Sequence, residues 1–228
     1  MKCVDLKRRT RVPCLGFAIL LIAAGCVGPR VHEPRNLSAS KAELVRYHES
    51  GAYERALSAV AVKASDWIKT RAARRAPGER QAVVLDIDET VLSNWESMKQ
   101  LDFGYVPERW EAWVESAGAK AIAPVRETYR TARAAGIAVI FLTGRDERQA
   151  SATERNLRQE GFGDFERLIV RTADHAHTSA VEFKTAARRA LVTEGWTIIA
   201  NVGDQKSDLI GGYAERTFKL PNPFYLTE

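Results

Sequence analysis

The sequence predicts an α/β fold built on a doubly wound parallel sheet, with helices before the sheet and a small aromatic-rich helical insertion after its first strand. Two predominantly apolar runs, 82–87 (AVVLDI) and 137–142 (IAVIFL), are typical of strands buried on both faces. Segments of helical length separate these strands and the later ones, and this alternation places helices on both faces of a parallel sheet. With 45% hydrophobic and 28% charged residues, the composition is that of one packed domain and excludes a disordered or fibrous chain.

We expect the first 25 residues to be a lipoprotein signal peptide. Five basic residues precede an uncharged run over residues 12–24. The run is too short to span a bilayer as a lone helix. The run ends in Ala23-Ala24-Gly25-Cys26, which resembles a bacterial lipobox, where the cysteine receives lipid and becomes the mature N-terminus. An ordinary cleaved signal peptide and a buried apolar strand are the alternatives. The lipobox predicts a protein of the bacterial cell envelope, anchored to a membrane through Cys26 and facing the periplasm or the exterior.

Cleavage before Cys26 changes what the remaining chain offers to partners. The formal net charge falls from +5 to +1, so nothing in the mature chain points to a nucleic-acid partner. Cys3 and Cys14 leave with the signal peptide, so the mature chain has no free thiol pair for a disulfide. Residues 26–39, with two prolines, indicate a tether, and residues 40–228 form the predicted domain.

The domain is expected to open with two helices. Ser40 and Glu43 have the spacing of a capping box, apolar residues continue at helical spacing to Ile68, and Pro77 follows the last of them. Gly51 divides this stretch in two. The remaining elements are predicted in chain order as a strand at 82–87, a helix at 125–135, a strand at 137–142, a helix at 146–160, a strand at 168–170, a helix at 180–192, and strands at 197–202 and 217–220.

Residues 93–124 interrupt the alternation as a cap-like insertion. The stretch is too long for a simple crossover and is unusually aromatic, and Pro107 can open a helix within it. On that helix Trp110 and Trp113 stand three residues apart and point to nearly the same side. The rings either pack the insertion onto the domain or face a bound substrate, for which Trp95, Trp110 and Trp113 are the candidates.

Polar side chains gather where the predicted strands end. Asp86 and Asp88 close the first strand, Thr143-Gly144-Arg145 follow the second, and Asp204 and Asp208 follow the fourth, while Lys184 lies on the helix before it. Carboxyl ends of parallel strands share one edge of a sheet, and ligands bind there. Crowded carboxylates repel each other, so a cation is expected among them, and oxygen ligands suit Mg²⁺.

This set of side chains predicts phosphoryl-transfer chemistry. Asp86 is the candidate nucleophile, which forms an aspartyl phosphate, and Asp88 is the candidate acid and base. Thr143, the Gly144 N–H and Lys184 are expected to bind the phosphoryl oxygens. Arg145 either pairs with a nearby carboxylate or contacts substrate.

The ordered set DIDET, LTGR, a distant lysine and GDQKSD resembles the four signature motifs of the haloacid dehalogenase superfamily, which has a Rossmann-like sheet. Five stretches, DIDETVLSN, the segment around ERWEAWV, IFLTGR, GDQKSDLIGG and the terminal FKLPNPFY, resemble its acid phosphatase branch. That branch includes bacterial surface lipoprotein acid phosphatases and plant vegetative storage proteins. The resemblance extends from about Tyr47 to the C-terminus.

The resemblance implies a role for each matching residue. Asp86 would be nucleophile and metal ligand, and Asp88 the acid and base with its backbone carbonyl on the metal. Asp204 would be a metal ligand, and Asp208 would complete the metal site by holding metal-bound water. Thr143 and Lys184 would bind phosphate. Storage relatives without activity have lost the nucleophilic aspartate, whereas this chain keeps Asp86.

Other nucleophile and ligand candidates are weaker. His175 and His177 lie in a polar loop, where histidines are more often plain surface residues. Ser207 has no paired histidine in the sequence pattern, so a serine hydrolase is not supported.

The sequence thus predicts an exported, lipid-anchored, Mg²⁺-dependent phosphomonoesterase, with nucleoside monophosphates as first candidate substrates. A non-catalytic surface or storage lipoprotein of the same fold, and a phosphotransferase, are the alternatives. The sequence does not indicate the oligomeric state.

Overall fold

The computed structural model describes residues 33–175 and 177–227. The predicted signal peptide, Cys26 and most of the predicted tether therefore lie outside the described residues. One compact unit extends from Asn36 to Glu228, and it contains the elements described below. None of the helices in the described part of the chain combines the length and the apolar composition needed to cross a membrane.

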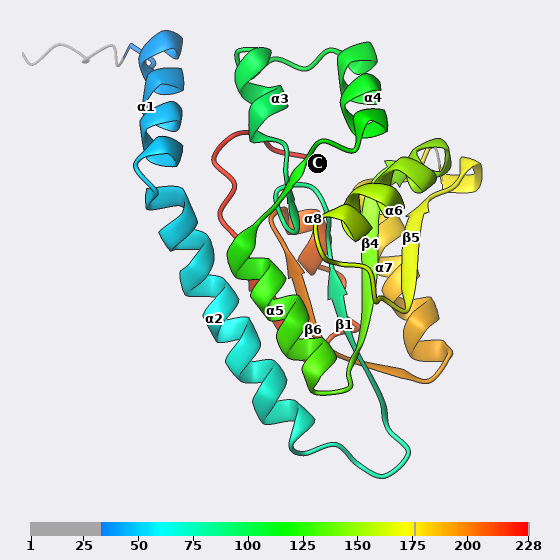
Figure 1. The fold of residues 1–228 in the computed structure, drawn as a ribbon. Coiled ribbons are helices and arrows are strands. Elements are labelled where there is room, and N and C mark those ends of the chain that lie inside the picture. Colours follow the sequence, from blue (N-terminus) through cyan, green and yellow to red (C-terminus); the bar gives the residue numbers. More distant parts are fainter. Residues whose placement is uncertain (1–32, 176, 228) are drawn as a thin grey trace, which may run out of the picture. The chain divides into compact units, whose positions relative to one another are not determined.

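A five-stranded parallel sheet forms the centre of this unit and confirms the predicted fold class (Figure 1). Its strands are β1 (Arg80–Leu85), β4 (Ala138–Asp146), β5 (Arg167–Arg171), β6 (Trp196–Gly203) and β7 (Thr217–Lys219), in the order β5-β4-β1-β6-β7. The order reverses at β1, which pairs with β4 on one side and with β6 on the other. Such a switch point creates a crevice at the carboxyl ends of the strands.

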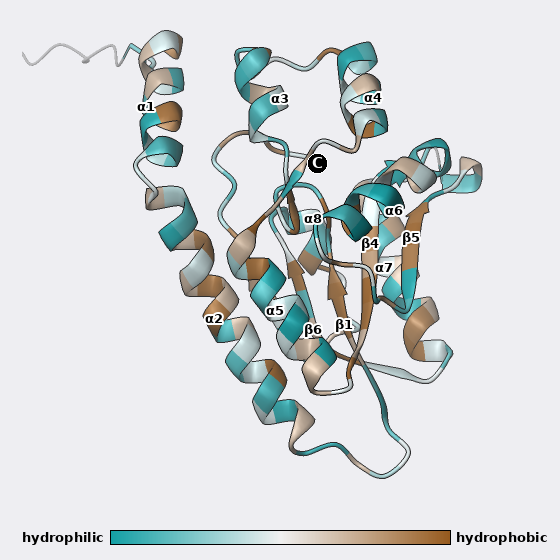
Figure 2. Cartoon of the chain, in the orientation of Figure 1, coloured by the Kyte–Doolittle hydropathy of each residue, from teal (hydrophilic) through white to brown (hydrophobic). Residues whose placement is uncertain are grey.

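The strands bury alternate side chains in two separate cores. Val83, Leu85 and Phe141 pack in one core with the buried residues of α2 (Ala52–Ala72) and α5 (Ala123–Ala134). Val84 and Ile140 pack in the other with Phe183 and Leu191 of α7 (Ala180–Thr193). Figure 2 shows β1, β4 and β6 as largely hydrophobic ribbons between helices that are hydrophilic on part of their surface. The predicted cover of both sheet faces is therefore confirmed, since both faces of a strand are apolar only when both are buried.

The first helix begins before the predicted capping box, so that box is wrong. Helix α1 (Leu37–Glu49) is capped by Asn36, whose Oδ1 accepts from the Ala39 N–H at 3.2 Å. Ser40 already lies inside the helix and donates its hydroxyl to the Asn36 carbonyl. Asparagine caps a helix as well as serine does, and the earlier start adds about one turn. The predicted tether accordingly overlaps the helix at 37–39.

The predicted break between the first two helices is confirmed. Gly51 separates α1 from α2 with φ +71°, a left-handed conformation that glycine adopts without strain.

The segment predicted as a helix at 146–160 differs in its first residues. There β4 runs on to Asp146, a 3₁₀ turn (Glu147–Gln149) follows, and α6 covers Ala150–Gln159.

The insertion stands over the carboxyl ends of the strands (Figure 1). It consists of α3 (Trp95–Gln100) and α4 (Pro107–Ser116), held at their base by the antiparallel pair β2 (Leu92–Ser93) and β3 (Lys120–Ala121). Pro107 opens α4 as predicted, whereas α3 was not predicted. The C-terminal segment after β7 returns to the same edge of the sheet, so it meets the insertion there.

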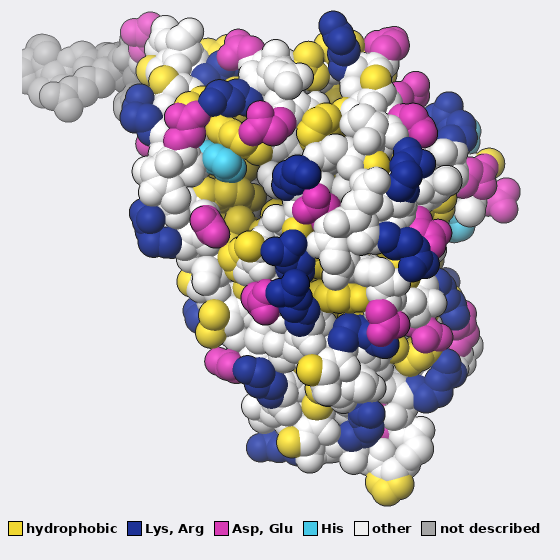
Figure 3. All heavy atoms as spheres, viewed as in Figure 1, with side chains coloured by type: hydrophobic (Ala, Val, Ile, Leu, Met, Phe, Trp, Pro, Cys, Tyr) yellow, Lys and Arg dark blue, Asp and Glu magenta, His cyan; other side chains and the backbone are white. Residues whose placement is uncertain are grey.

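On the face shown in Figure 3, basic and acidic side chains are interspersed. Several pairs lie within ion-pair distance, among them Arg133 with Asp164 at 2.5 Å and Arg158 with Glu154 at 2.7 Å. Exposed pairs of this kind contribute little to stability, about 0–1 kcal/mol each.

Candidate active site

Three buried carboxylates meet at the carboxyl edge of the sheet. Asp86 directly follows β1, Asp204 directly follows β6, and Asp208 lies on the short helix α8 (Lys206–Leu209). One carboxylate oxygen from each lies within 4.8 Å of the others. Gly203 permits this approach, because a Cβ at that position would collide with the Asp208 carboxyl group.

Lys184 contacts this acidic cluster. Its Nζ donates to Asp86 Oδ1 at 2.6 Å and to Asp208 Oδ1 at 2.5 Å. Burial alone would lower the pKa of Lys184, but the two carboxylates outweigh it and the pKa is raised. Three carboxylates and one ammonium leave two negative charges in excess, which a divalent cation balances.

The pKa values of the cluster point the same way. Burial, and then repulsion from Asp208, raises the pKa of Asp86 well above its usual range and also raises that of Asp204. Buried carboxylates with hard oxygen donors are the ligand set that Mg²⁺ or a similar divalent ion takes in proteins. The donor set of Asp86, Asp204 and Asp208 therefore fits a metal ion.

Side chains from three segments hold the Asp204 carboxylate. Thr90 Oγ1 donates to Oδ1 at 3.1 Å, while Gln205 Nε2 and Asn222 Nδ2 donate to Oδ2 at 2.5 and 2.7 Å. Asn222 belongs to the C-terminal segment, so that segment contributes directly to the acidic cluster.

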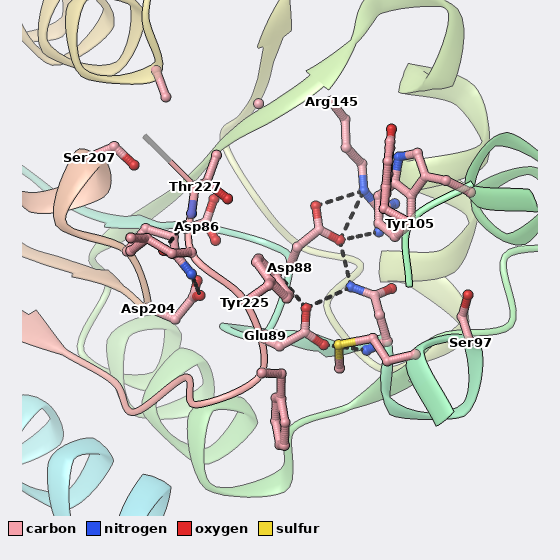
Figure 4. Close-up of a pocket in the computed structure, with 18 of the residues that line it drawn as sticks. Asp86, Asp88, Glu89, Ser97, Tyr105, Arg145, Asp204, Ser207, Tyr225 and Thr227 are labelled. Atoms are coloured by element: carbon pink, nitrogen blue, oxygen red, sulfur yellow. Dashed lines mark hydrogen bonds and ion pairs between the residues drawn. The ribbon is translucent and has the colours of Figure 1, made fainter. Parts of the chain in front are cut away.

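Asp88 does not join the cluster through its side chain. Arg145 donates to it from Nε at 3.2 and 3.1 Å and from Nη2 at 2.6 Å, and Asn94 Nδ2 donates to Oδ1 at 2.9 Å. In Figure 4 the Asp88 carboxyl group points toward Arg145 and away from Asp204. Of the two alternatives for Arg145, the structure shows the pairing with a carboxylate.

The two other predicted phosphate ligands differ in their exposure. Gly144 is exposed and lines the cavity, and the space where a Cβ would stand is open. Thr143 is fully buried at the end of β4, and its Oγ1 accepts from the Arg145 N–H at 3.2 Å. Its side chain is not part of the cavity wall, so any contact with phosphate needs a small shift of this strand end.

A cavity of about 780 Å³ opens above the acidic cluster. A volume in this range accommodates a small organic molecule rather than phosphate alone. Its floor contains the catalytic candidates, and its walls come from the insertion and the C-terminal segment. The aromatic wall residues are Phe103, Tyr105, Trp110, Phe224 and Tyr225.

Of the three candidate tryptophans, Trp110 lines the cavity. Its ring centroid lies 5.5 Å from the Arg145 guanidinium carbon. Trp95 is buried and stacks on His48 with ring centroids 3.8 Å apart. Trp113 donates from Nε1 to Asn94 Oδ1 at 2.8 Å and packs against the core. Trp95 and Trp113 therefore pack the insertion against the rest of the domain, which is the first of the two alternatives for these rings.

Sequence reasoning missed a buried network around Glu89. This residue is 1% exposed, and it accepts hydrogen bonds from the Asn94 N–H at 2.6 Å and from Tyr225 OH at 2.6 Å. Burial, and then repulsion from Asp88, raises the pKa of Glu89 to about 8. Glu89 lies within DIDET and Tyr225 within FKLPNPFY, so the resemblance of these stretches was the available signal.

The structure gives no catalytic role to the weaker candidates His175, His177 and Ser207. His175 bonds through Nδ1 to Thr172 Oγ1 at 2.8 Å, and neither His175 nor His177 is among the cavity-lining residues. Ser207 is buried and lines the cavity, but no described histidine lines it to activate a serine.

Comparisons with known proteins agree with this geometry. The chain is 39% identical to "Acid phosphatase 1" of Solanum lycopersicum over 150 residues, covering 64% of this chain and 59% of that protein. It is 30% identical to "Vegetative storage protein 1" of Arabidopsis thaliana, covering 62% of this chain and 54% of that protein. The chain thus spans less than two thirds of the length of these plant relatives.

A solved structure shares the fold. The class C acid phosphatase from Bacillus anthracis superposes with a TM-score of 0.68 at 21% identity, covering 82% of this chain and 86% of that chain. The family model described as "HAD superfamily, subfamily IIIB (Acid phosphatase)" matches residues 30–228, which include every residue of the acidic cluster. On the strength of that match, the chain belongs to subfamily IIIB, the acid phosphatases, of the HAD superfamily.

Proposed function

We propose that this chain is a Mg²⁺-dependent phosphomonoesterase that works through an aspartyl-phosphate intermediate. The observation that carries the proposal is the position of Asp86, which is buried at the floor of the cavity between Lys184 and the other two carboxylates. Asp86, Asp204 and Asp208 would hold the metal. The bound ion supplies positive charge that lets a carboxylate approach a phosphate dianion.

In the first step, an Asp86 carboxylate oxygen attacks the phosphorus atom and the ester P–O bond breaks. Asp88 donates its proton to the leaving oxygen, which departs as an alcohol. Lys184 neutralises charge on the phosphoryl oxygens from the side where it already bonds Asp86. The Gly144 N–H, at the exposed end of β4, is the backbone donor for the same oxygens.

In the second step, Asp88 takes a proton from water, and the water oxygen attacks the phosphorus atom of the aspartyl phosphate. The acyl P–O bond breaks, which restores Asp86 and releases phosphate. The hydrogen bonds of Asp88 favour its Oδ2 for the proton. Oδ2 accepts from Arg145 Nε alone, whereas Oδ1 accepts from Arg145 and Asn94.

For the substrate, we infer a phosphomonoester whose leaving group carries an aromatic ring, with nucleoside monophosphates as first candidates. Trp110, Phe103 and Tyr105 support this, since they line the cavity as flat apolar surfaces on which a base can stack. A phosphotransferase differs only in the acceptor of the second step. Formation of glycerol phosphate from added glycerol would identify a phosphotransferase.

The experiment is phosphate release from p-nitrophenyl phosphate by the purified chain, before and after chelation. We expect activity that disappears on chelation and returns with Mg²⁺. Full activity after exhaustive chelation would reject the metal requirement. No release under any condition would favour the non-catalytic storage alternative. The same assay on Asp86→Asn should show no release. Asp66→Asn is its matched control, because Asp66 is an exposed aspartate on α2 and its loss removes a carboxylate away from the site.

Export and lipid anchoring form a separate part of the proposal, supported by the lipobox-like stretch that ends at Cys26. Two acyl chains would hold the protein on a membrane. Cys26→Ala should leave catalysis intact and move the protein out of the membrane fraction, or block its processing. Unchanged membrane partitioning of this variant would refute the anchor.

A further inference from the structure

Among the described residues, four cationic side chains line the cavity, and three of them have carboxylate partners. Lys184 is paired with Asp86 and Asp208, Arg145 with Asp88, and Arg148 with Asp146. The fourth, Arg171, forms no ion pair with any described carboxylate. A guanidinium that lines a cavity without a counter-charge requires an explanation, because its charge is not compensated by the protein itself.

The hydrogen bonds of Arg171 leave one edge of the guanidinium free. Nη1 donates to the Thr178 carbonyl at 2.8 Å and, at 3.5 Å, to that of His175. Nε is buried and donates to no described group. The hydrogen bonds of Arg171 to described residues come from Nη1, and none comes from Nη2. The Nε and Nη2 N–H groups point in parallel from one edge, which is an edge that binds a carboxylate or phosphate with two hydrogen bonds.

Other arginines of this chain show what that edge does when an acid is nearby. Arg71 donates from Nε to Glu215 at 2.8 Å and from Nη2 at 2.9 Å. Arg145 uses the same two nitrogens on Asp88, and Arg133 uses them on Asp164. In Arg171 no described carboxylate accepts from the corresponding Nε and Nη2 edge.

The position of Arg171 suits a ligand. It is the last residue of β5 and lies in register with Asp146 at the end of β4, so it stands at the carboxyl edge of the sheet. Asp146, its neighbour, is engaged by Arg148 at 2.6 Å. The Arg171 guanidinium carbon lies 5.4 Å from the ring centroid of Phe183, which is buried and gives the planar group a fixed support.

Helix α7 relates the position of Arg171 to that of the reacting centre. Arg171 is bonded to Thr178, just before this helix, whereas Lys184 lies on its second turn. Ala180 and Lys184 both line the cavity and are one turn apart, about 6 Å along the axis. Arg171 is thus held at the start of α7 and Lys184 lies on its second turn, so an anion on Arg171 would lie apart from the phosphoryl group on Asp86.

We propose that Arg171 forms a second anion site, so that the preferred substrates are phosphomonoesters carrying another anionic group, a carboxylate or a second phosphate, a few bonds from the reacting ester. The reacting phosphoryl group lies over Asp86 and Lys184, and the second anion binds the Nε and Nη2 edge of Arg171. This inference rests on the proposed phosphomonoesterase activity and specifies its substrate class.

The test compares substrates that differ in the second anion. Glycerol 3-phosphate and 3-phosphoglycerate form a pair for a carboxylate, and adenosine 5′-monophosphate and adenosine 3′,5′-bisphosphate form a pair for a phosphate. In each pair the wild-type protein should show the higher kcat/KM, by about 10- to 100-fold, for the substrate with the second anion. A preference in one pair only would assign the site to that anion, and equal values in both pairs would overturn the proposal.

Variants then locate the effect. Arg171→Gln should remove most of the preference, mainly through KM. Arg171→Lys should keep part of it, because it retains the charge without the two parallel donors. Arg148→Gln is the matched control, since Arg148 lines the same cavity, is exposed and already has Asp146 as its partner. It should preserve the wild-type preference.

Two results would contradict the proposal. If Arg171→Gln, folded by circular dichroism, weakens all four substrates equally, Arg171 binds the reacting phosphate or supports the fold. If Arg148→Gln removes the preference instead, the site lies elsewhere. If Arg171→Gln fails to fold, the wild-type ratios and the Arg171→Lys variant still decide. Absence of turnover on all four substrates would instead count against the phosphomonoesterase itself.

Discussion

Arg145 and Asp88 form a partly buried two-nitrogen ion pair, with Nη2 to Oδ1 at 2.6 Å and Nε to Oδ2 at 3.1 Å. The Arg145 side chain is only 2% exposed and is fixed further by Thr153, which accepts from Nη1 at 3.1 Å. Arg145 therefore fixes the direction of the proposed acid and base without touching the acidic cluster.

Replacing Arg145 should impair the step that Asp88 serves. Arg145→Lys keeps a charge but cannot supply two parallel donors, so we expect kcat to fall by about 10- to 100-fold for alkyl phosphates. The fall should be much smaller for p-nitrophenyl phosphate, whose leaving group needs little protonation. Steady-state kinetics with both substrates checks this, and an equal loss for both would show that Arg145 does not act through Asp88.

Trp95 and Trp110 should respond oppositely to substitution. Trp95→Leu removes a ring packed between His48, Phe103 and Phe224, so it should destabilise the fold by about 2–4 kcal/mol and affect all substrates alike. Trp110→Leu should leave the melting temperature nearly unchanged and raise KM by about 5- to 150-fold for nucleotides alone. Thermal melting and a comparison of nucleotides with glycerol 3-phosphate distinguish them. Uniform effects from Trp110→Leu would remove the support for nucleotide stacking.

Asn222 should tune metal binding from the C-terminal segment. Its Nδ2 orients the Asp204 carboxylate, and loss of a group that orients a ligand costs about 10- to 100-fold in metal affinity. Asn222→Ala should therefore raise the Mg²⁺ concentration needed for half-maximal activity, with kcat largely recovered at saturating Mg²⁺. Titration of activity with Mg²⁺ measures this. A normal Mg²⁺ requirement would show that Thr90 and Gln205 suffice.

Acid should destabilise the fold partly through Glu79. Hydrogen bonds from Arg71, and then from the Ala76 N–H, lower the pKa of Glu79 to about 2. A lowered carboxyl pKa stabilises the folded state above the usual value near 4.5, and this contribution is lost as the pH falls from there toward 2. Glu79→Gln should lower the melting temperature at pH 7 and flatten its decline between pH 5 and 2. An unchanged profile would mean that the pair contributes nothing measurable.

The fold and the acidic cluster followed from the sequence because their signals are local. Strands β1 and β4 each contain a continuous apolar run, and Asp86 and Asp204 stand at the first positions after β1 and β6, where parallel strands must end together. The partners of these residues were not predictable in this way. Tyr225 donates to Glu89 across 136 residues of sequence, and no periodic pattern records such a contact.

The tryptophans of α4 show a second limit. Helical spacing places the Cβ atoms of Trp110 and Trp113 on nearly one side, but it does not fix where the rings turn. Trp113 turns to Asn94, whose side chain provides an acceptor for its N–H, and Trp110 turns to the cavity. The difference depends on Asn94, which lies outside the helix.

The identity of the phosphorylated residue during turnover tests the proposed aspartyl-phosphate mechanism most directly. The protein is mixed with a phosphomonoester and Mg²⁺, quenched in acid within one turnover, digested and analysed by mass spectrometry. We expect one phosphoryl group on Asp86, and neither label nor activity in Asp86→Asn. A phosphoryl group on another residue, or an Asp86→Asn protein that is folded and turns over at the wild-type rate, would contradict it.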